Sequence, residues 1–354
     1  MTQPGFFDLD ERHALLEKLG DPLPKLARLV NWEGFRETLA KVREKERKSN
    51  AGRKPFDVVL MFKVLVLQHL YNLSDEQIEY QIRDRTSFCR FLGLTPEGRV
   101  PDARTVWLLR EQIKTLDLVD GLFVALLAQI EASGYTPKKG QIVDASIVAA
   151  PRQRNTRQEN DALKRGQTPI DWDASEQAAK RRQKDTEARW VKKHGKTYYG
   201  YKNHISIDRA HKLVRCFEVS DASEHDSQAF GAVLDPANTS RDVWADSAYR
   251  SQECEAQLRQ WGYRSRIHTK GNRNRPLNAR QKEANRKRSV VRARVEHVFG
   301  AQAAMGGKLV RTTHLLTGTR AMLDGWISWK FALLLDSQHV EFMPSSNKRK
   351  NSYF

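Results

Sequence analysis

The sequence predicts an α/β protein in which an all-helical N-terminal region precedes a mixed five-stranded sheet with flanking helices. Apolar residues recur at helical spacing up to about residue 134, whereas β-rich segments begin at Gln141. From there the predicted order is three strands, helix, strand, helix, strand, helix. Three consecutive strands favour an antiparallel start, and the later alternation favours parallel additions.

Short amphipathic segments make up the N-terminal region. Pro55 suits the first turn of a helix, and Ser74 and Gln77 have capping-box spacing before the next one. Such helices, joined by tight polar turns, predict either a helix-turn-helix assembly or an ordinary bundle, with equal support from these residues alone. The predicted helices are Pro55–Leu73, Asp75–Arg85, a third from Asp102 to near Gln112, and Leu118–Ile130, after a basic arm or solvated helix face at 41–54.

The second region is predicted to span 135–310, and a C-terminal helix with a basic tail would follow at 311–354. Its strands are expected at Gln141–Ala150, Tyr198–Asp208, Lys212–Ser220, Val243–Tyr249 and Tyr263–Thr269, and its helices at Asp226–Val233, Gln252–Trp261 and Asn278–Phe299. Residues 151–193 are charged and poor in apolar side chains, which predicts an insertion that is at best partly ordered and orders on a partner. The late apolar stretch Ala321–Val340 contains Asp324 and Lys330, so we expect a buried helix rather than a membrane span.

The charge balance points to a polyanionic partner. The 354 residues carry 61 Lys and Arg against 43 Asp and Glu, a net charge of +18. Nucleic acid is the simplest such partner, and a merely soluble basic surface is the alternative. Three widely separated cysteines without a CxxC pair argue against a disulfide framework and a cysteine zinc site, and fit a reducing compartment. The N-terminus shows no secretory signal pattern.

Three acids lie where chemistry at a phosphate could use them. Asp144 is in the middle of the first predicted strand, Asp246 ends the apolar run of the fourth, and Glu296 lies in the last basic helix. If the first and fourth strands are neighbours, the two aspartates can face each other and the helix can deliver Glu296. Taken singly, each acid has an ordinary alternative role. Asp144 could hydrogen-bond to a local turn, Asp246 could cap the next turn, and Glu296 could form an i,i+4 pair with Arg292.

Clustered carboxylates repel one another and persist when a cation is present. Hard oxygen ligands with few His or Cys suit Mg²⁺ or Mn²⁺. Two such ions can activate a water or a 3′-hydroxyl at a phosphorus centre, so the set predicts phosphodiester chemistry. Arg292 and Arg288, on the Glu296 helix, would fix a carboxylate or bind a phosphate. The predicted DNA-binding or supporting residues also include Lys202, Arg294, Tyr249, Arg53 and Lys54, whereas His204 is more simply a structural histidine.

Five motifs stand out along the second region: VDASIV around Asp144, YGYKNHISID at 199–208, ASEHDSQAF at 222–230, ADSAY around Asp246 and RARVEHVFG around Glu296. In these motifs the chain resembles the DDE transposases of bacterial insertion sequences, in the IS-five (InsH-like) group. The N-terminal stretch 52–94 is similar to the helical region of that group. The similarity runs from about 51 to 331.

The resemblance implies an RNase H-like catalytic core, with Asp144, Asp246 and Glu296 as an acidic triad that binds two Mg²⁺. It also implies cleavage and strand transfer on double-stranded DNA at terminal inverted repeats, a synaptic homodimer, and a place in the bacterial cytoplasm without a membrane anchor. Related transposases carry a Tyr-Arg-Glu-Lys pattern. Arg292 and Glu296 fit it, whereas Ser289 and Ala303 replace the Tyr and the Lys.

Two alternatives stay open at this point. A stand-alone RNase H-like nuclease would cleave without joining, but the N-terminal helical region argues against it. A catalytically inactive DNA-binding relative would bind without cleaving, and the presence of all three acids argues against that.

Overall fold

The computed structural model describes residues 5, 7–44, 53–169, 172, 184–193, 195–272, 274 and 276–310. The predicted C-terminal helix and tail at 311–354 lie outside these residues, as does most of the 41–54 arm. None of the described helices is long and apolar enough to cross a membrane.

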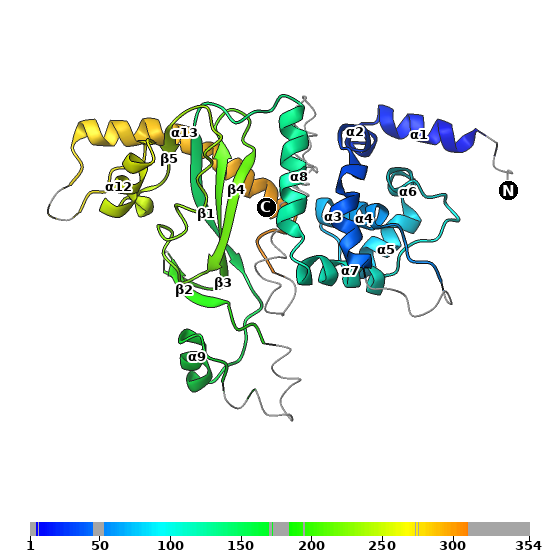
Figure 1. The fold of residues 1–354 in the computed structure, drawn as a ribbon, viewed down its shortest axis with the longest axis horizontal. Coiled ribbons are helices and arrows are strands. Elements are labelled where there is room, and N and C mark those ends of the chain that lie inside the picture. Colours follow the sequence, from blue (N-terminus) through cyan, green and yellow to red (C-terminus); the bar gives the residue numbers. More distant parts are fainter. Residues whose placement is uncertain are drawn as a thin grey trace, which may run out of the picture.

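The N-terminal region is helical, as predicted (Figure 1). The Asp57 side chain accepts hydrogen bonds from the amides of Val59 and Leu60 and caps the most buried helix, and the predicted Ser74–Gln77 capping box is present. The helices are α1 (Asp8–Lys18), α2 (Leu23–Leu29), η1 (Trp32–Phe35), α3 (Arg36–Ala40), η2 (Lys41–Arg43), α4 (Val58–Leu70), α5 (Asp75–Asp84), α6 (Thr86–Leu92), α7 (Ala103–Thr115) and α8 (Val119–Ala132).

The second region is built on a mixed sheet. Antiparallel β1 (Gln141–Ala149) and β3 (Lys196–Asp208) pair along their length, β4 (Val214–Asp221) continues the antiparallel half, and β5 (Asp242–Trp244) and β6 (Arg264–Ser265) add in parallel beyond β1. The helices of this region are α9 (Arg157–Lys164), η4 (Ser247–Tyr249), α12 (Gln252–Gln260) and α13 (Ala279–Ala304). This mixed sheet with flanking helices is the RNase H-like α/β fold that the resemblance implied.

Among the described residues the sheet has six strands rather than the five predicted, because β2 (Arg189–Lys193) lies inside the segment predicted to be an insertion. β2 pairs with the first half of β3, through Gly200, and β4 pairs with the rest. Gly200 has φ +150°, and a Cβ there would overlap the Val148 carbonyl oxygen, so this position requires glycine. The segment also holds α9, and fully buried Trp172 donates a 2.7 Å hydrogen bond to Glu159.

Several predicted elements are wrong in extent or type. The fifth strand, predicted at Tyr263–Thr269, is only Arg264–Ser265. The helix predicted at Asp226–Val233 is a series of turns, because the Asp226 carboxylate pairs with Lys202 at 2.8 Å instead of capping a helix. The fourth strand ends at Trp244, and Asp246 begins the short helix η4.

Strand alternation assigns α12 and α13 to opposite faces of the sheet. Ile142 packs in the same core as Val295 of α13, whereas Val143 packs with Leu258 of α12. Asp144 therefore shares the α13 face with Ile142.

Helix α8 joins the two regions through one continuous core. Its Phe123 ring meets the Phe217 ring of β4 edge to face at 4.8 Å, and α8 stands beside the sheet (Figure 1). Arg215 of β4 is 7% exposed and pairs both with Glu131 of α8 and, at 3.1 Å, with Asp235. The two regions are thus tied by aromatic packing and by the pair between buried Arg215 and the partly exposed Glu131.

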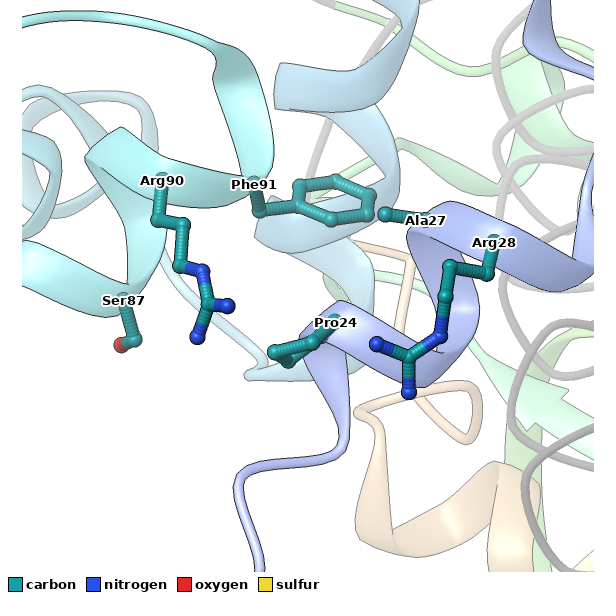
Figure 2. A pocket seen from close by; sticks show the side chains of 6 residues that line it. All are labelled: Pro24, Ala27, Arg28, Ser87, Arg90 and Phe91. Atoms are coloured by element: carbon teal, nitrogen blue, oxygen red, sulfur yellow. The ribbon is translucent and has the colours of Figure 1, made fainter. Parts of the chain in front are cut away.

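A small hollow of about 200 Å³ lies between α2 and α6 in the N-terminal region (Figure 2). The side chains of Arg28 and Arg90 flank it, and Phe91 lines it. Both arginines pair with Glu17 of α1 at 3.1 Å. Their positive charges are therefore paired within the chain, with the Glu17 carboxylate.

Candidate active site

Asp144 lies in β1, and Asp246 follows shortly after the end of β5, the parallel neighbour of β1. Gln141 pairs with Val243 and Ile142 with Trp244 in the ladder between β1 and β5. The same register, continued by two residues, brings Asp144 beside Asp246. The Asp246 carboxylate raises the pKa of Asp144, which agrees with this closeness.

Asp144 is buried and carries two kinds of hydrogen bond. Its Oδ1 accepts from the amide of Ala145 at 2.9 Å, and its Oδ2 accepts from Nε and Nη2 of Arg292 at 3.2 and 3.1 Å. Burial raises the pKa of the Asp144 carboxyl to about 6, although the Arg292 charge acts to lower it. A carboxyl that is costly to ionise in isolation is one that a cation would stabilise strongly.

Asp246 caps η4 and remains available for chemistry. Its Oδ1 accepts a 2.5 Å hydrogen bond from the amide of Ala248, which fixes the carboxylate at the end of β5. A cap through one oxygen leaves the other oxygen of the same carboxylate for a ligand. Asp246 can therefore serve both as the cap of η4 and as a metal ligand, the two roles considered from the sequence.

Glu296 lies near Asp144 but points toward solvent. Nη2 of Arg292 is 3.1 Å from Asp144 Oδ2 and 4.0 Å from Glu296 Oε1, so these oxygens are no farther apart than the sum of the two distances. The Glu296 side chain is 66% exposed. Within the part of the chain that the structure describes, no group of three or more His, Cys, Asp or Glu side chains lies close enough together to hold a metal ion. The Arg292 guanidinium stands between Asp144 and Glu296 instead.

The donors present nevertheless fit a hard divalent cation. Asp144, Asp246 and Glu296 supply carboxylate oxygens, which Mg²⁺ prefers. The buried hydroxyl of Tyr249 finds no hydrogen-bond partner among the described residues, and burial together with Asp144 and Asp246 raises its pKa well above the usual value. An unsatisfied buried hydroxyl beside paired carboxylates suits a site that takes up a hydrated ion.

The structure separates Lys202 and His204 from Asp144. Lys202 pairs with Ile147 and His204 with Ala145 across the antiparallel ladder. Their side chains therefore lie on the face of the sheet opposite to that of Asp144. His204 Nε2 lies 2.8 Å from the Ser220 hydroxyl, and burial lowers its pKa to about 4, as suits a structural histidine. Sequence reasoning missed Asp226 as the partner of Lys202, because their ion pair spans two strands and a turn.

The other predicted support residues are spread more widely. Arg288 donates to the Ile267 carbonyl at 2.9 Å, near the candidate site, and Arg294 on the same helix is half-buried. Arg53 and Lys54 are exposed in the N-terminal region, where Arg99 donates a 2.7 Å hydrogen bond to the Lys54 carbonyl.

Comparisons with known proteins match both regions. Residues 10–112 match the model of a transposase domain (DUF772), and residues 135–315, just over half of the chain, match the model of the transposase DDE domain. The chain is also similar to a chain from a cryo-EM structure of a piggyBac transposase synaptic complex with hairpin DNA, at 13% identity. That match covers 90% of this chain and 75% of the other, with a TM-score of 0.46.

The second match contains Asp144, Asp246 and Glu296, together with the sheet and α13 that carry them. Transposases of this kind act on DNA and generally need divalent metal ions. The narrower insertion-sequence group stays a prediction. The chain belongs to the DDE transposase family, and it is a DNA transposase.

Proposed function

We propose that this transposase binds the terminal repeats of an insertion sequence, cleaves DNA at a 3′ end and joins that end to target DNA. Asp144, Asp246 and Glu296 would hold two Mg²⁺ ions, with Mn²⁺ as a substitute. The observation that supports the proposal is the parallel register of β1 and β5, which would pair Asp144 with Asp246 if it continued by two residues. Both carboxylates are held by backbone amides, so the pair is positioned before any ion binds.

The chemistry consists of two displacements at phosphorus. Water attacks the phosphodiester at the transposon end, and the 3′-hydroxyl leaves. That hydroxyl then attacks a target phosphodiester, and a target 3′-hydroxyl leaves. When bound, the ions would polarise the phosphate and stabilise the attacking and leaving oxygens.

Arg292 would then change partners. In the free chain its charge compensates Asp144, and once cations occupy the carboxylates this compensation is no longer needed. Because an arginine fork matches a phosphate as well as a carboxylate, Arg292 would bind a DNA phosphate near the cut.

The two regions would divide the work in a synaptic homodimer. Residues 1–134 would read the terminal repeats through a helix-turn-helix, and residues 135–310 would cut and join. The short turn between α4 and α5, together with the capping box at Ser74, is compatible with such a motif.

Nicking and strand-transfer assays on an end-containing duplex with Mg²⁺ test the proposal. Asp144→Asn and Glu296→Gln should each bind the duplex and fail both to nick and to join. Glu283→Gln, an exposed glutamate on the same helix, is the matched control and should act as wild type. Cleavage without joining by the wild-type protein would identify a nuclease, and full activity of either active-site variant would refute the triad.

A further inference from the structure

A second feature of the catalytic region is an open groove beside the candidate site. Its volume is about 670 Å³, and Arg250, Arg259 and Lys270 line it together with Glu255. Arg250 follows Asp246 after the single turn of η4, so the groove begins next to the proposed metal site.

Positive charge is crowded around this groove. Arg250 and Arg288 both donate to the Ile267 carbonyl, at 3.1 and 2.9 Å, and both lie 3.3 Å from Thr269 Oγ1. Burial lowers the pKa of Arg288, and the charges of Arg250 and Arg266 lower it further. Cations that share acceptors and repel one another would be stabilised by a polyanion.

The nearby carboxylates do not neutralise the positive charges of the groove. Glu255 is 3.7 Å from Arg250, and among the described residues neither Arg259 nor Lys270 forms an ion pair with a carboxylate. Both side chains are exposed at the rim of the groove. They are therefore free to meet an external anion.

The groove lies at the far end of the molecule from the N-terminal helices. Along the longest axis, α12 is at one end, α1 to α7 are at the other, and β1 and β5 stand between them (Figure 1). A duplex that runs from the N-terminal helices past Asp144 and Asp246 would continue toward α12. The DNA that reaches the groove is then beyond the cut.

We propose that Arg250, Arg259 and Lys270 bind the phosphate backbone of duplex DNA on the side of the cut away from the terminal repeat. This rests on the proposed function. Before cleavage that DNA is the donor flank, and during joining it is the target. The contact is to phosphates and is independent of base sequence.

The test compares duplexes that differ only beyond the cut. One end-containing duplex stops at the cleavage site, and the other carries about one further helical turn of flank, roughly 10 base pairs. Binding is measured by fluorescence anisotropy over a salt series without divalent metal. The variants are Arg259→Ala, Lys270→Ala and their combination, Lys270→Arg keeps the charge, and Lys138→Ala removes an exposed charge from the loop before β1.

Wild type should bind the flanked duplex more tightly and with a steeper salt dependence. The double variant should lose this advantage, with a slope less steep by about 2. It should bind the flankless duplex as wild type does, and Lys270→Arg and Lys138→Ala should behave as wild type on both. A second assay, the joining of a precut end to target DNA, distinguishes the donor flank from the target. If the double variant loses joining, the groove binds target DNA as well. If its joining is unchanged, the groove binds only the donor flank.

Equal loss on both duplexes, or no loss on either, would overturn the groove assignment. These results leave the proposed function standing if wild type still nicks and joins. If wild type neither nicks nor joins but the flank effect is present, the groove assignment survives and the proposed function fails.

Discussion

Arg292 of α13 donates two hydrogen bonds, from Nε and Nη2, to Asp144 Oδ2 of β1. This contact places a fixed positive charge among the acids that we assign to the metals, and the same guanidinium reaches Glu296 at 4.0 Å. In the free chain, the arginine therefore competes with a divalent cation for Asp144.

Arg292→Ala should bind Mn²⁺ more tightly than wild type in the absence of DNA, because the competing charge is gone. Cleavage should nevertheless fall, because the side chain that would hold a phosphate is also lost. Calorimetric titration with Mn²⁺ measures the first effect, and nicking rates measure the second. Unchanged or weaker Mn²⁺ binding would show that Arg292 does not compete with the ion.

Arg215→Ala should destabilise the protein by about 3–5 kcal/mol, because it leaves the carboxylate of Asp235 without its buried partner. Denaturant unfolding, followed by circular dichroism, measures the loss. Arg286→Ala removes an exposed pair with Glu283 on α13 and should have little effect. Equal effects of the two substitutions would mean that the buried pair between Arg215 and Asp235 contributes no more to stability than an exposed pair.

His204 should make stability fall in acid. Its folded pKa of about 4 is below the unfolded value of 6.5, so the neutral form is stabilised in the native state. That contribution is fully present above pH 6.5, declines as the pH falls from 6.5 toward 4, and amounts to about 3 kcal/mol. The difference in unfolding free energy between wild type and His204→Gln should shrink over this window. A difference that is constant with pH would contradict the assignment.

Trp172→Ala should loosen the segment around α9 while leaving β1 intact. Trp172 is fully buried and donates to Glu159, whose side chain also belongs to the capping box of α9. Hydrogen exchange should therefore speed up in α9 and stay slow in β1. Trp172→Phe, which keeps most of the apolar contact, should show a smaller change. Uniform acceleration across the sheet would mean that the segment does not open independently.

The features that the sequence predicted correctly are those with local signals. The capping box at Ser74 and Gln77 is present as its spacing indicated, and the β-rich segments of β1 and β3 are strands. The helix predicted from Pro55 begins only at Val58, where Asp57 caps it. Strand β2 was not predicted, because its side chains are mostly exposed and its place depends on pairing with β3.

The candidate site also combines features with a local sequence signal and features that depend on contacts distant in sequence. The sequence predicted Asp144 in the first strand and Asp246 at the end of the apolar run of the fourth, and it left open whether these strands are neighbours; the ladder between β1 and β5 shows that they are. The Arg292 contact could be predicted only in kind: the sequence indicated that Arg292 would fix a carboxylate or bind a phosphate, but not that the carboxylate would be Asp144, 148 positions away. The sequence indicated that this helix could lie across the neighbouring strands and deliver Glu296, but it carries no signal for which individual side chains of α13 and β1 meet.

Replacement of Asp246 by cysteine tests the central claim most directly, because Mn²⁺ accepts a sulfur ligand more readily than Mg²⁺. With end-containing DNA, Asp246→Cys should bind normally, should be inactive with Mg²⁺ and should recover nicking with Mn²⁺. Nicking by this variant with Mg²⁺ at the wild-type rate would contradict the assignment of Asp246 as a metal ligand.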